Sequence, residues 1–369
     1  MLNVYKIFKM NMAFRTGVLL SFLSFILMSN TIEAAETTKK MNIHIQKIQY
    51  AFKRNFGDVK IEKIIQVGSN SFSSSILYKV YTKNKPYIVR FINKELDDGH
   101  REVKSMMIAS NRALTPKIYD VDVNEGIIIM DFVSDRSFTE KEQSNPETYI
   151  KLAKLIKKLH QSPPFPKFLS IFDAMRLNHK NRGRYLSTLS KEGTKKLVLI
   201  ENATKNLEVL SSTHNDLNPN NILFDGKDFL IIDWEFAGFG DPFYDLATVS
   251  NFYIFDKQLE KIYLKTYFDR EPTSTELAHY YLMKQVSLYY YGNELVHLAR
   301  KMGLKTLTKK QIVELPSLRE YNDKLESEKG SLQDPQYLEK FGNVLLKEAI
   351  TNMNSNKFAK SISLLEHSK

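Results

Sequence analysis

Residues 213–247 constrain this chain more than any other stretch, and they read THNDLNPNNILFDGKDFLIIDWEFAGFGDPFYDLA. Their first half places His214, Asp216 and Asn221 at the spacing H-x-D-x4-N, and Asp233 ends the apolar run 229–232. Moving a γ-phosphoryl group requires metal ions held against the phosphates and one carboxylate beside the attacking hydroxyl. Asp and Asn oxygens are the hard ligands that Mg²⁺ prefers. The stretch therefore predicts phosphoryl transfer.

The spacing also assigns positions to these side chains. We expect Asp216 on a loop as a base or orienting group, and Asn221 with its side-chain oxygen turned toward a metal. The strand before Asp233 would bring its carboxylate to a metal that bridges the phosphates. The H-x-D-x4-N pattern alone is expected by chance in roughly a few of every hundred chains of this length. The strand and the second Asp make the signal specific.

Composition limits the partners without deciding the chemistry. A chain of 369 residues can bury one large core or two lobes, and 43% hydrophobic and 26% charged residues are typical of a globular protein. The formal net charge is +11, but the lysines are scattered, so we expect a solvated surface and no nucleic-acid partner. The chain has no cysteine, which excludes disulfides, thiolate metal sites and a Cys nucleophile.

The N-terminus, residues 1–40, has the layout of a leader. Basic residues up to Arg15 precede the uncharged run 16–31, and small residues from Ala34 follow, as in a secretory signal too short to span a membrane comfortably. Glu33 makes the cleavage site poor, and export would separate an ATP-dependent enzyme from its cosubstrate. Three readings stay open: a true signal, an uncleaved anchor that leaves the catalytic domain in the cytoplasm and associates with the membrane, or a start at Met41.

Residues 41–133 are predicted to form an N-terminal lobe that begins with an antiparallel meander. Its strands are expected at 61–67, 73–82 and 86–92. The loop between the first two strands contains Ser69 and Asn70, where a turn would cover nucleotide phosphates. Because this loop has a single glycine, a plain hairpin loop is the alternative.

Two further groups in this lobe point to a nucleotide. Arg90 lies between apolar residues of the third strand, and Glu102 lies on the next helix, about 99–112. If the two pair, the forked guanidinium can bind phosphate oxygens; the alternative is a surface arginine and an unrelated glutamate. Met130 and Phe132 flank a candidate hinge that would meet adenine.

Residues 134–369 are predicted to be mostly helical. One apolar-periodic helix ends at His160, which we interpret as a helix-end residue rather than a ligand. Tyrosines are dense on a later helix: Tyr280, Tyr281, Tyr289, Tyr290 and Tyr291. Ring faces attract cations, although aromatic residues at helical spacing are also typical of a core. We expect one or two of the five to face a substrate pocket, with Tyr289 and Tyr290 as the candidates.

The order of these features resembles the choline and ethanolamine kinases and their relatives, the aminoglycoside phosphotransferases. The resemblance covers about 61–298 and is sharpest at HND with Asn221, at IDWEFAG and at DPFYDLA. Glu235, two residues after Asp233, looks more like the choline and ethanolamine branch. The resemblance implies an α+β, two-lobed protein-kinase-like fold, with a small antiparallel-sheet lobe and a larger helical lobe, that uses ATP and Mg²⁺.

The resemblance also implies roles for the residues that match its motifs. Asp216 would be the catalytic base, Asn221 and Asp233 the magnesium ligands, and Arg90, paired with Glu102, the phosphate-binding cation.

Three other positions receive supporting roles by the same likeness. His214 would brace the catalytic loop, Asp245 would hold that loop from behind, and Glu235 would lie near the substrate amine. The chain departs from the family in its glycine-poor phosphate loop and in the lack of tryptophan in the late helices.

The sequence therefore predicts a small-molecule kinase that phosphorylates the hydroxyl of an amino alcohol such as choline or ethanolamine. A protein kinase would need a long activation segment after the metal-binding Asp, but seven residues separate Asp233 from Asp241. An aminoglycoside-type phosphotransferase and a membrane-associated, non-catalytic kinase-fold protein stay open as alternatives. A non-catalytic kinase-fold protein would be expected to have lost Asp216, Asn221 or Asp233, and all three are present. The oligomeric state is left open.

Overall fold

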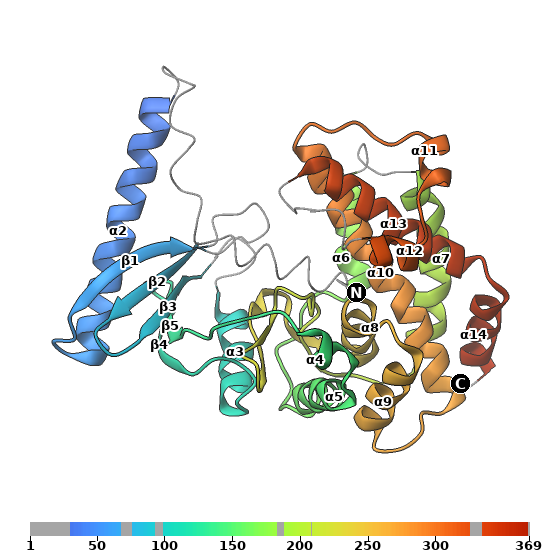
Figure 1. The fold of residues 1–369 in the computed structure, drawn as a ribbon, viewed down its shortest axis with the longest axis horizontal. Helices are drawn as coiled ribbons and strands as arrows, with labels where there is room; N and C mark the ends of the chain where they lie inside the picture. The colour runs from blue at the N-terminus through green and yellow to red at the C-terminus, as the bar shows by residue number, and fades with distance from the viewer. Residues whose placement is uncertain are drawn as a thin grey trace. The chain divides into compact units, whose positions relative to one another are not determined.

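The computed structural model describes residues 30–67, 76–92, 99–182, 188–207, 209–324 and 334–367. These residues divide into two compact units, one up to Ser134 and one from Asp135 (Figure 1). Ser69 and Asn70 lie outside the described residues, as does nearly all of the leader expected at 1–40. Within the described residues, no helix combines the length and the apolar character needed to cross a bilayer.

The N-terminal unit is built on a five-stranded antiparallel sheet with the strand order β1-β2-β3-β5-β4. Its strands are β1 (Ile61–Val67), β2 (Ile76–Thr82), β3 (Pro86–Phe91), β4 (Ile118–Asp122) and β5 (Ile127–Asp131). The predicted meander β1-β2-β3 is confirmed. The helix α3 (His100–Asn111) follows β3, and β5 then pairs on both sides, which buries its apolar run. The edge strand β4 was not predicted.

A long helix, α2 (Asn30–Phe56), precedes the sheet and was also not predicted. Ile48, Ala51 and Phe52 recur at i, i+3 and i+4, and all three are buried against the sheet. One turn earlier, His44 stacks on Phe91 with ring centroids 3.9 Å apart. The second half of α2 therefore completes the core of this unit.

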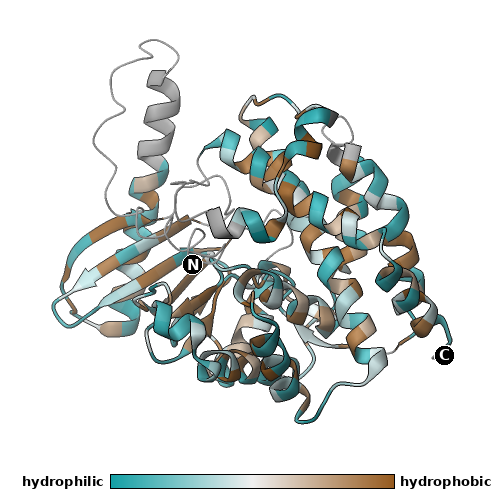
Figure 2. Cartoon of the chain, turned by 45° about the vertical axis from the view of Figure 1, so that its right-hand side comes forward, coloured by the Kyte–Doolittle hydropathy of each residue, from teal (hydrophilic) through white to brown (hydrophobic). Residues whose placement is uncertain are grey.

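The second unit is mainly helical, and most of its helices begin at a side chain that caps the helix N-terminus. Its helices are α4 (Glu140–Ser144), α5 (Pro146–His160), α6 (Ile171–Arg182), α7 (Thr188–Thr204), α8 (Pro242–Tyr253), α9 (Lys257–Phe268), α10 (Ser274–Lys301), α11 (Lys309–Glu314), α12 (Leu318–Lys324), α13 (Pro335–Met353) and α14 (Asn356–His367). Thr273, for example, forms a capping box with Glu276 at the start of α10. In Figure 2 many of these helices are striped brown and teal, as expected where one face is packed and the other is solvated.

Two close contacts fix the centre of the helical unit. The helix α8 is buried along its whole length and lies against α10. Helices α10 and α13 approach each other closely at Gly292 and Gly342, where a Cβ on Gly342 would lie 2.8 Å from the Gly292 carbonyl oxygen. Only residues without a side chain allow this approach.

Two short antiparallel ladders hold the stretch 213–247. Strand β6 (Ser211–Thr213) pairs with β9 (Gly238–Gly240), and β7 (Ile222–Phe224) pairs with β8 (Phe229–Ile231). The 3₁₀ helix η3 (Trp234–Phe236) lies between β8 and β9. The chain between β6 and β7 and the chain between β8 and β9 are therefore brought side by side.

Candidate active site

The loop between β6 and β7 is joined to the end of β8 by two hydrogen bonds. The Ile232 amide donates to the Asn221 carbonyl at 2.9 Å, and His214 Nε2 lies 3.0 Å from the Ile232 carbonyl oxygen. Asp233 follows Ile232 directly. The structure thus brings Asn221, Asp233 and the loop that carries Asp216 into one region of the helical unit.

Asp216 is half-buried, and hydrogen-bond donors surround its carboxylate. Tyr291 Oη donates to Oδ1 at 2.6 Å and Asn218 Nδ2 donates to the same oxygen at 2.9 Å. Asn221 Nδ2 donates to Oδ2 at 2.8 Å. Burial raises the pKa of Asp216 to about 7, against the opposing effect of the bonds from Tyr291 and Asn218. A carboxyl with such a pKa can both accept and release a proton near neutral pH.

Two further carboxylates contribute to the field around Asp216. Asp233 and Glu235 both raise the pKa of Asp216 through their negative charge. Glu235 is buried in η3, next to the fully buried Trp234, whose ring lies edge-on to Phe165. The region around Asp216 is therefore acidic.

His214 is fully buried and contacts the backbone on both sides of the loop. Its Nε2 donates to the Ile232 carbonyl, and its Nδ1 accepts the Asp216 amide at 3.3 Å. Burial lowers the pKa of His214, which favours the neutral ring that this pair of bonds requires. These contacts fit a residue that braces the loop, and they leave neither ring nitrogen for a reacting group.

Asp245, in the first turn of α8, lies behind the same loop and is fully buried. Its carboxylate accepts the His214 amide at 2.7 Å and the Asn215 amide at 2.8 Å. His160 Nε2 lies 3.2 Å from Asp245 Oδ2, and Tyr267 Oη lies 2.8 Å from His160 Nδ1. The expectation that Asp245 holds this loop from behind is confirmed, and His160, at the end of α5, extends that support.

Asn221 and Asp233 supply oxygen atoms of the kind that bind Mg²⁺. Asn221 turns Nδ2 toward Asp216, and its Oδ1 accepts no hydrogen bond from the described residues. Asp233 has φ 68°, an uncommon left-handed conformation that turns the chain directly after β8. The described residues contain no cluster of three or more His, Asp or Glu side chains that could hold a metal. A site with one carboxylate and one amide oxygen still fits Mg²⁺, because substrate phosphates and water complete its coordination.

The tyrosines of α10 contact different parts of the helical unit. Tyr289 is fully buried, and its hydroxyl donates to the Ser190 carbonyl at 2.5 Å, toward α7. The structure therefore does not bring Tyr289 to Asp216. Instead Tyr291 reaches Asp216, and the Tyr290 ring lies edge-on to Tyr291 with centroids 5.3 Å apart. Residues two positions apart on a helix point to nearly opposite sides, which is why Tyr289 and Tyr291 contact different parts of the unit.

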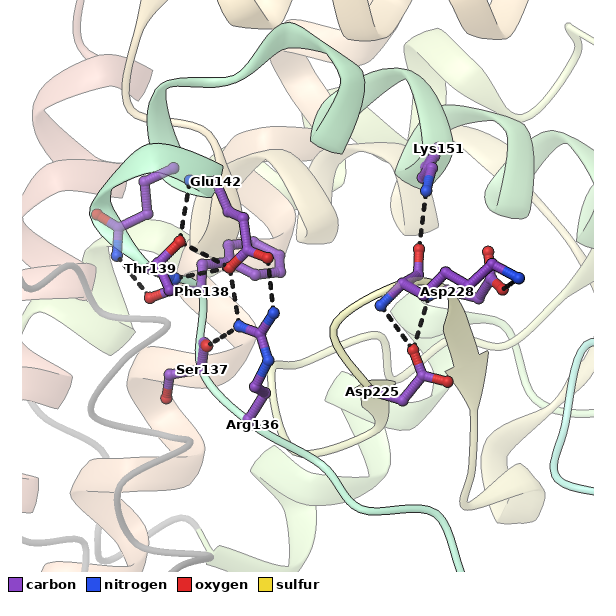
Figure 3. Close-up of polar contacts among 10 residues, drawn as sticks. Arg136, Ser137, Phe138, Thr139, Glu142, Lys151, Asp225 and Asp228 are labelled. Atoms are coloured by element: carbon purple, nitrogen blue, oxygen red, sulfur yellow. Dashed lines mark hydrogen bonds and ion pairs between the residues drawn. The ribbon is translucent and has the colours of Figure 1, made fainter.

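The hairpin of β7 and β8 is fastened at its far end to the start of the helical unit. The Phe224 amide donates to Asp135 Oδ1 at 2.8 Å, and the Arg136 amide donates to the Phe224 carbonyl at 3.0 Å. Figure 3 shows Arg136 paired with Glu142, and Lys151 donating to the turn of the hairpin. These contacts hold the hairpin whose other end carries Asn221 and Asp233.

In the N-terminal unit, Arg90 and Glu102 form a buried ion pair between Arg90 Nη1 and Glu102 Oε1, so the predicted pairing is confirmed. Met130 is buried on β5. Phe132 follows β5, and Lys79 Nζ lies 3.4 Å from the centre of its ring.

A five-stranded antiparallel sheet followed by a mainly helical region is a kinase-like fold. A sequence model of one family, described as "Phosphotransferase enzyme family", matches residues 65–278, which is more than half of the chain. The chain belongs to this phosphotransferase family. Its matched region contains Arg90, Glu102 and every candidate residue from His214 to Glu235.

Named proteins similar to this chain include Protein LicA and solved structures of a choline/ethanolamine kinase family protein, a choline kinase and a spectinomycin phosphotransferase. Protein LicA of Haemophilus influenzae is 25% identical over 169 residues, 43% of this chain and 63% of that protein. The chain spans 63% and 50% of the lengths of two such curated relatives. Among solved structures, a choline/ethanolamine kinase family protein from Mesorhizobium loti has a TM-score of 0.61 at 16% identity and covers 83% of this chain and 92% of its own. Choline kinase from Cryptosporidium parvum has a TM-score of 0.61 at 14% identity and covers 87% and 99%.

Proposed function

We propose that this phosphotransferase is an ATP- and Mg²⁺-dependent kinase that phosphorylates the hydroxyl of a small amino alcohol such as choline or ethanolamine. The observation that carries the proposal is the character of the region around Asp216. The charges of Asp233 and Glu235 act on Asp216, Tyr291 donates a hydrogen bond to it, and the Tyr290 ring packs edge-on against the Tyr291 ring. Carboxylates and aromatic rings together favour a cationic ligand.

The nucleotide side of the proposal is supported by relatives. One structure similar to this chain is LicA in complex with AMP, and another is spectinomycin phosphotransferase with ADP and spectinomycin. We infer that Arg90, oriented by its ion pair with Glu102, binds phosphate oxygens, and that Met130 and Phe132 meet adenine. Dependence on ATP favours a cytoplasmic location for the catalytic domain.

In the proposed reaction, Asn221 and Asp233 would hold Mg²⁺, which would offset the negative charge of the phosphates. Asp216 orients the acceptor hydroxyl and takes its proton as the hydroxyl oxygen bonds to the γ-phosphorus. The bond from that phosphorus to the β–γ bridging oxygen breaks, so ADP leaves and the proton passes from Asp216 to solvent. His214 and Asp245 keep the loop in position throughout.

The test is to incubate the full chain with ATP, Mg²⁺ and separate acceptors: choline, ethanolamine, kanamycin, spectinomycin and casein. We expect ADP release together with a phosphomonoester of an amino alcohol in the phosphorus NMR spectrum. Asp216→Asn should lower the rate of transfer by about a hundredfold to ten-thousandfold and leave a small residual rate, whereas Asp228→Asn, on the exposed hairpin turn, should leave the rate unchanged. If only kanamycin or spectinomycin is phosphorylated, the acceptor is an aminoglycoside-type compound and not an amino alcohol. No transfer to either amino alcohol, or full activity of Asp216→Asn, would overturn the proposal.

A further inference from the structure

The hydrogen bonds of Asp216 distinguish its two carboxylate oxygens. An ionised carboxylate offers about four lone-pair positions, two on each oxygen. Both positions on Oδ1 are taken, by Tyr291 Oη and by Asn218 Nδ2. Within the described part of the chain, Oδ2 accepts one bond, from Asn221 Nδ2. One position on Oδ2 is therefore left for an incoming hydroxyl.

Tyr291 is suited to hold Oδ1 permanently. Its side chain is buried in α10, and its ring lies edge-on to Phe252 with centroids 5.0 Å apart. Burial raises the pKa of Tyr291 well above its ordinary value, so its hydroxyl keeps its proton and acts as a donor to Asp216. A phenol fixed in this way has two rotatable bonds, both restricted by packing, and it cannot swing aside as a flexible side chain would.

We propose that Tyr291 is a positioning residue that reserves Oδ2 of Asp216 for the acceptor hydroxyl by occupying Oδ1. This inference rests on the proposed function and adds a residue to it. With Tyr291 in place, an acceptor reaches Asp216 from the Oδ2 side, which is also the side of Asn221. Without the Tyr291 hydroxyl, Oδ1 becomes a second docking position, and an acceptor bound there is misaligned with the γ-phosphorus.

The reasoning predicts a specific pattern in the kinetics of Tyr291→Phe, which keeps the ring and removes the donor. Misplacing a reacting group by about 1 Å can lower the rate by about a hundredfold. We therefore expect kcat to fall about tenfold to a hundredfold, with the KM for ATP unchanged. Choline and ethanolamine are the acceptors, and ADP release without an acceptor reports transfer to water.

A double-mutant cycle separates positioning through Asp216 from a structural role. If Tyr291 acts through Asp216, then Tyr291→Phe should change the residual rate by less than about twofold when Asp216 is already alanine. A merely structural role would give the same loss in both backgrounds. Tyr281→Phe is the matched control, because Tyr281 is on the same helix and its partly buried hydroxyl donates to the Asn352 carbonyl, away from Asp216. That variant should keep the parent's kcat.

The outcomes distinguish this inference from the proposed function on which it rests. If the parent phosphorylates an amino alcohol and Tyr291→Phe retains its kcat, the inference is wrong and the proposed function stands. Equal losses for Tyr291→Phe with and without the Asp216 side chain would also overturn the inference. If the parent hydrolyses ATP but transfers to neither amino alcohol, the acceptor assignment fails, and the same cycle on hydrolysis decides the role of Tyr291. A parent with neither activity overturns both.

Discussion

Replacing Asp245 by alanine should destabilise the helical unit and displace the catalytic loop in one step. The Asp245 carboxylate is fully buried and accepts the amides of His214 and Asn215 at 2.7 and 2.8 Å. The Asn215 bond holds a residue at φ 64°, a left-handed conformation that Asn tolerates better than most residues. Removing the carboxylate therefore leaves two amides without acceptors.

The magnitude follows from the cost of unsatisfied groups. Each buried donor left without a partner costs about 1–3 kcal/mol, so two of them cost about 2–6 kcal/mol. In a unit of this size about 1 kcal/mol lowers the melting temperature by about 2–4 °C, so Asp245→Ala should melt about 10 °C lower. Asp245→Asn keeps one acceptor oxygen but turns an amide group toward the other donor, and it should cost about half as much.

Trp234 makes the measurement local. It is the only tryptophan in the chain and its ring lies edge-on to His214, with centroids 4.9 Å apart. Urea unfolding followed by tryptophan fluorescence therefore reports on the loop that Asp245 holds. Asp228→Ala, on the exposed turn of the hairpin, should stay within about 0.5 kcal/mol of the parent. A loss below about 1 kcal/mol for Asp245→Ala would refute the view that its bonds hold the loop.

Three further predictions concern stability. Glu102→Gln removes the charge from a buried ion pair and should destabilise the N-terminal unit by about 3 kcal/mol, measured by hydrogen exchange in β3; unchanged protection would contradict this. Gly342→Ala should destabilise by about 1–3 kcal/mol in urea, although alanine favours helices, because its Cβ would meet the Gly292 carbonyl; a more stable variant would argue against the close contact. Burial raises the pKa of Glu260, but the neighbouring Lys284 lowers it by more, so the pKa of Glu260 lies below its ordinary value of 4.5. Ionised Glu260 therefore stabilises the fold at neutral pH, and this stabilisation is lost as the pH falls below about 4.5. The loss of unfolding free energy caused by Glu260→Gln, measured by urea unfolding, should therefore become smaller below about pH 4.5. A loss that does not change with pH would contradict a lowered pKa of Glu260.

Local patterns predicted the elements whose ends are marked by turn or capping residues. Strand β1 begins and ends at the expected residues, because its short run rich in Ile and Val is typical of a strand. The ion pair of Arg90 and Glu102 was also predictable, since it joins a strand to the helix that follows. The apolar spacing of Ile48, Ala51 and Phe52 could have revealed α2, but it lies beside the leader-like segment and was not assigned.

The remaining differences arise from tertiary packing. Helical periodicity shows that the tyrosines of α10 point in several directions, but not which direction faces Asp216. That depends on how α10 is set against α8 and α13, and the close approach at Gly292 helps to fix it. Tyr291 rather than Tyr289 then points at the catalytic loop. Edge strand β4 was missed because its five residues, two of them Asp, give a weak strand signal.

The left-handed conformation of Asp233 has a consequence for how this site can change over generations. Of the residues that tolerate φ 68°, glycine adopts it most readily, and an Asp codon becomes a Gly codon by a single base change. Such a substitution would relieve the backbone while deleting the proposed metal ligand. A single base change could therefore remove the proposed metal ligand while the backbone of the loop keeps its conformation.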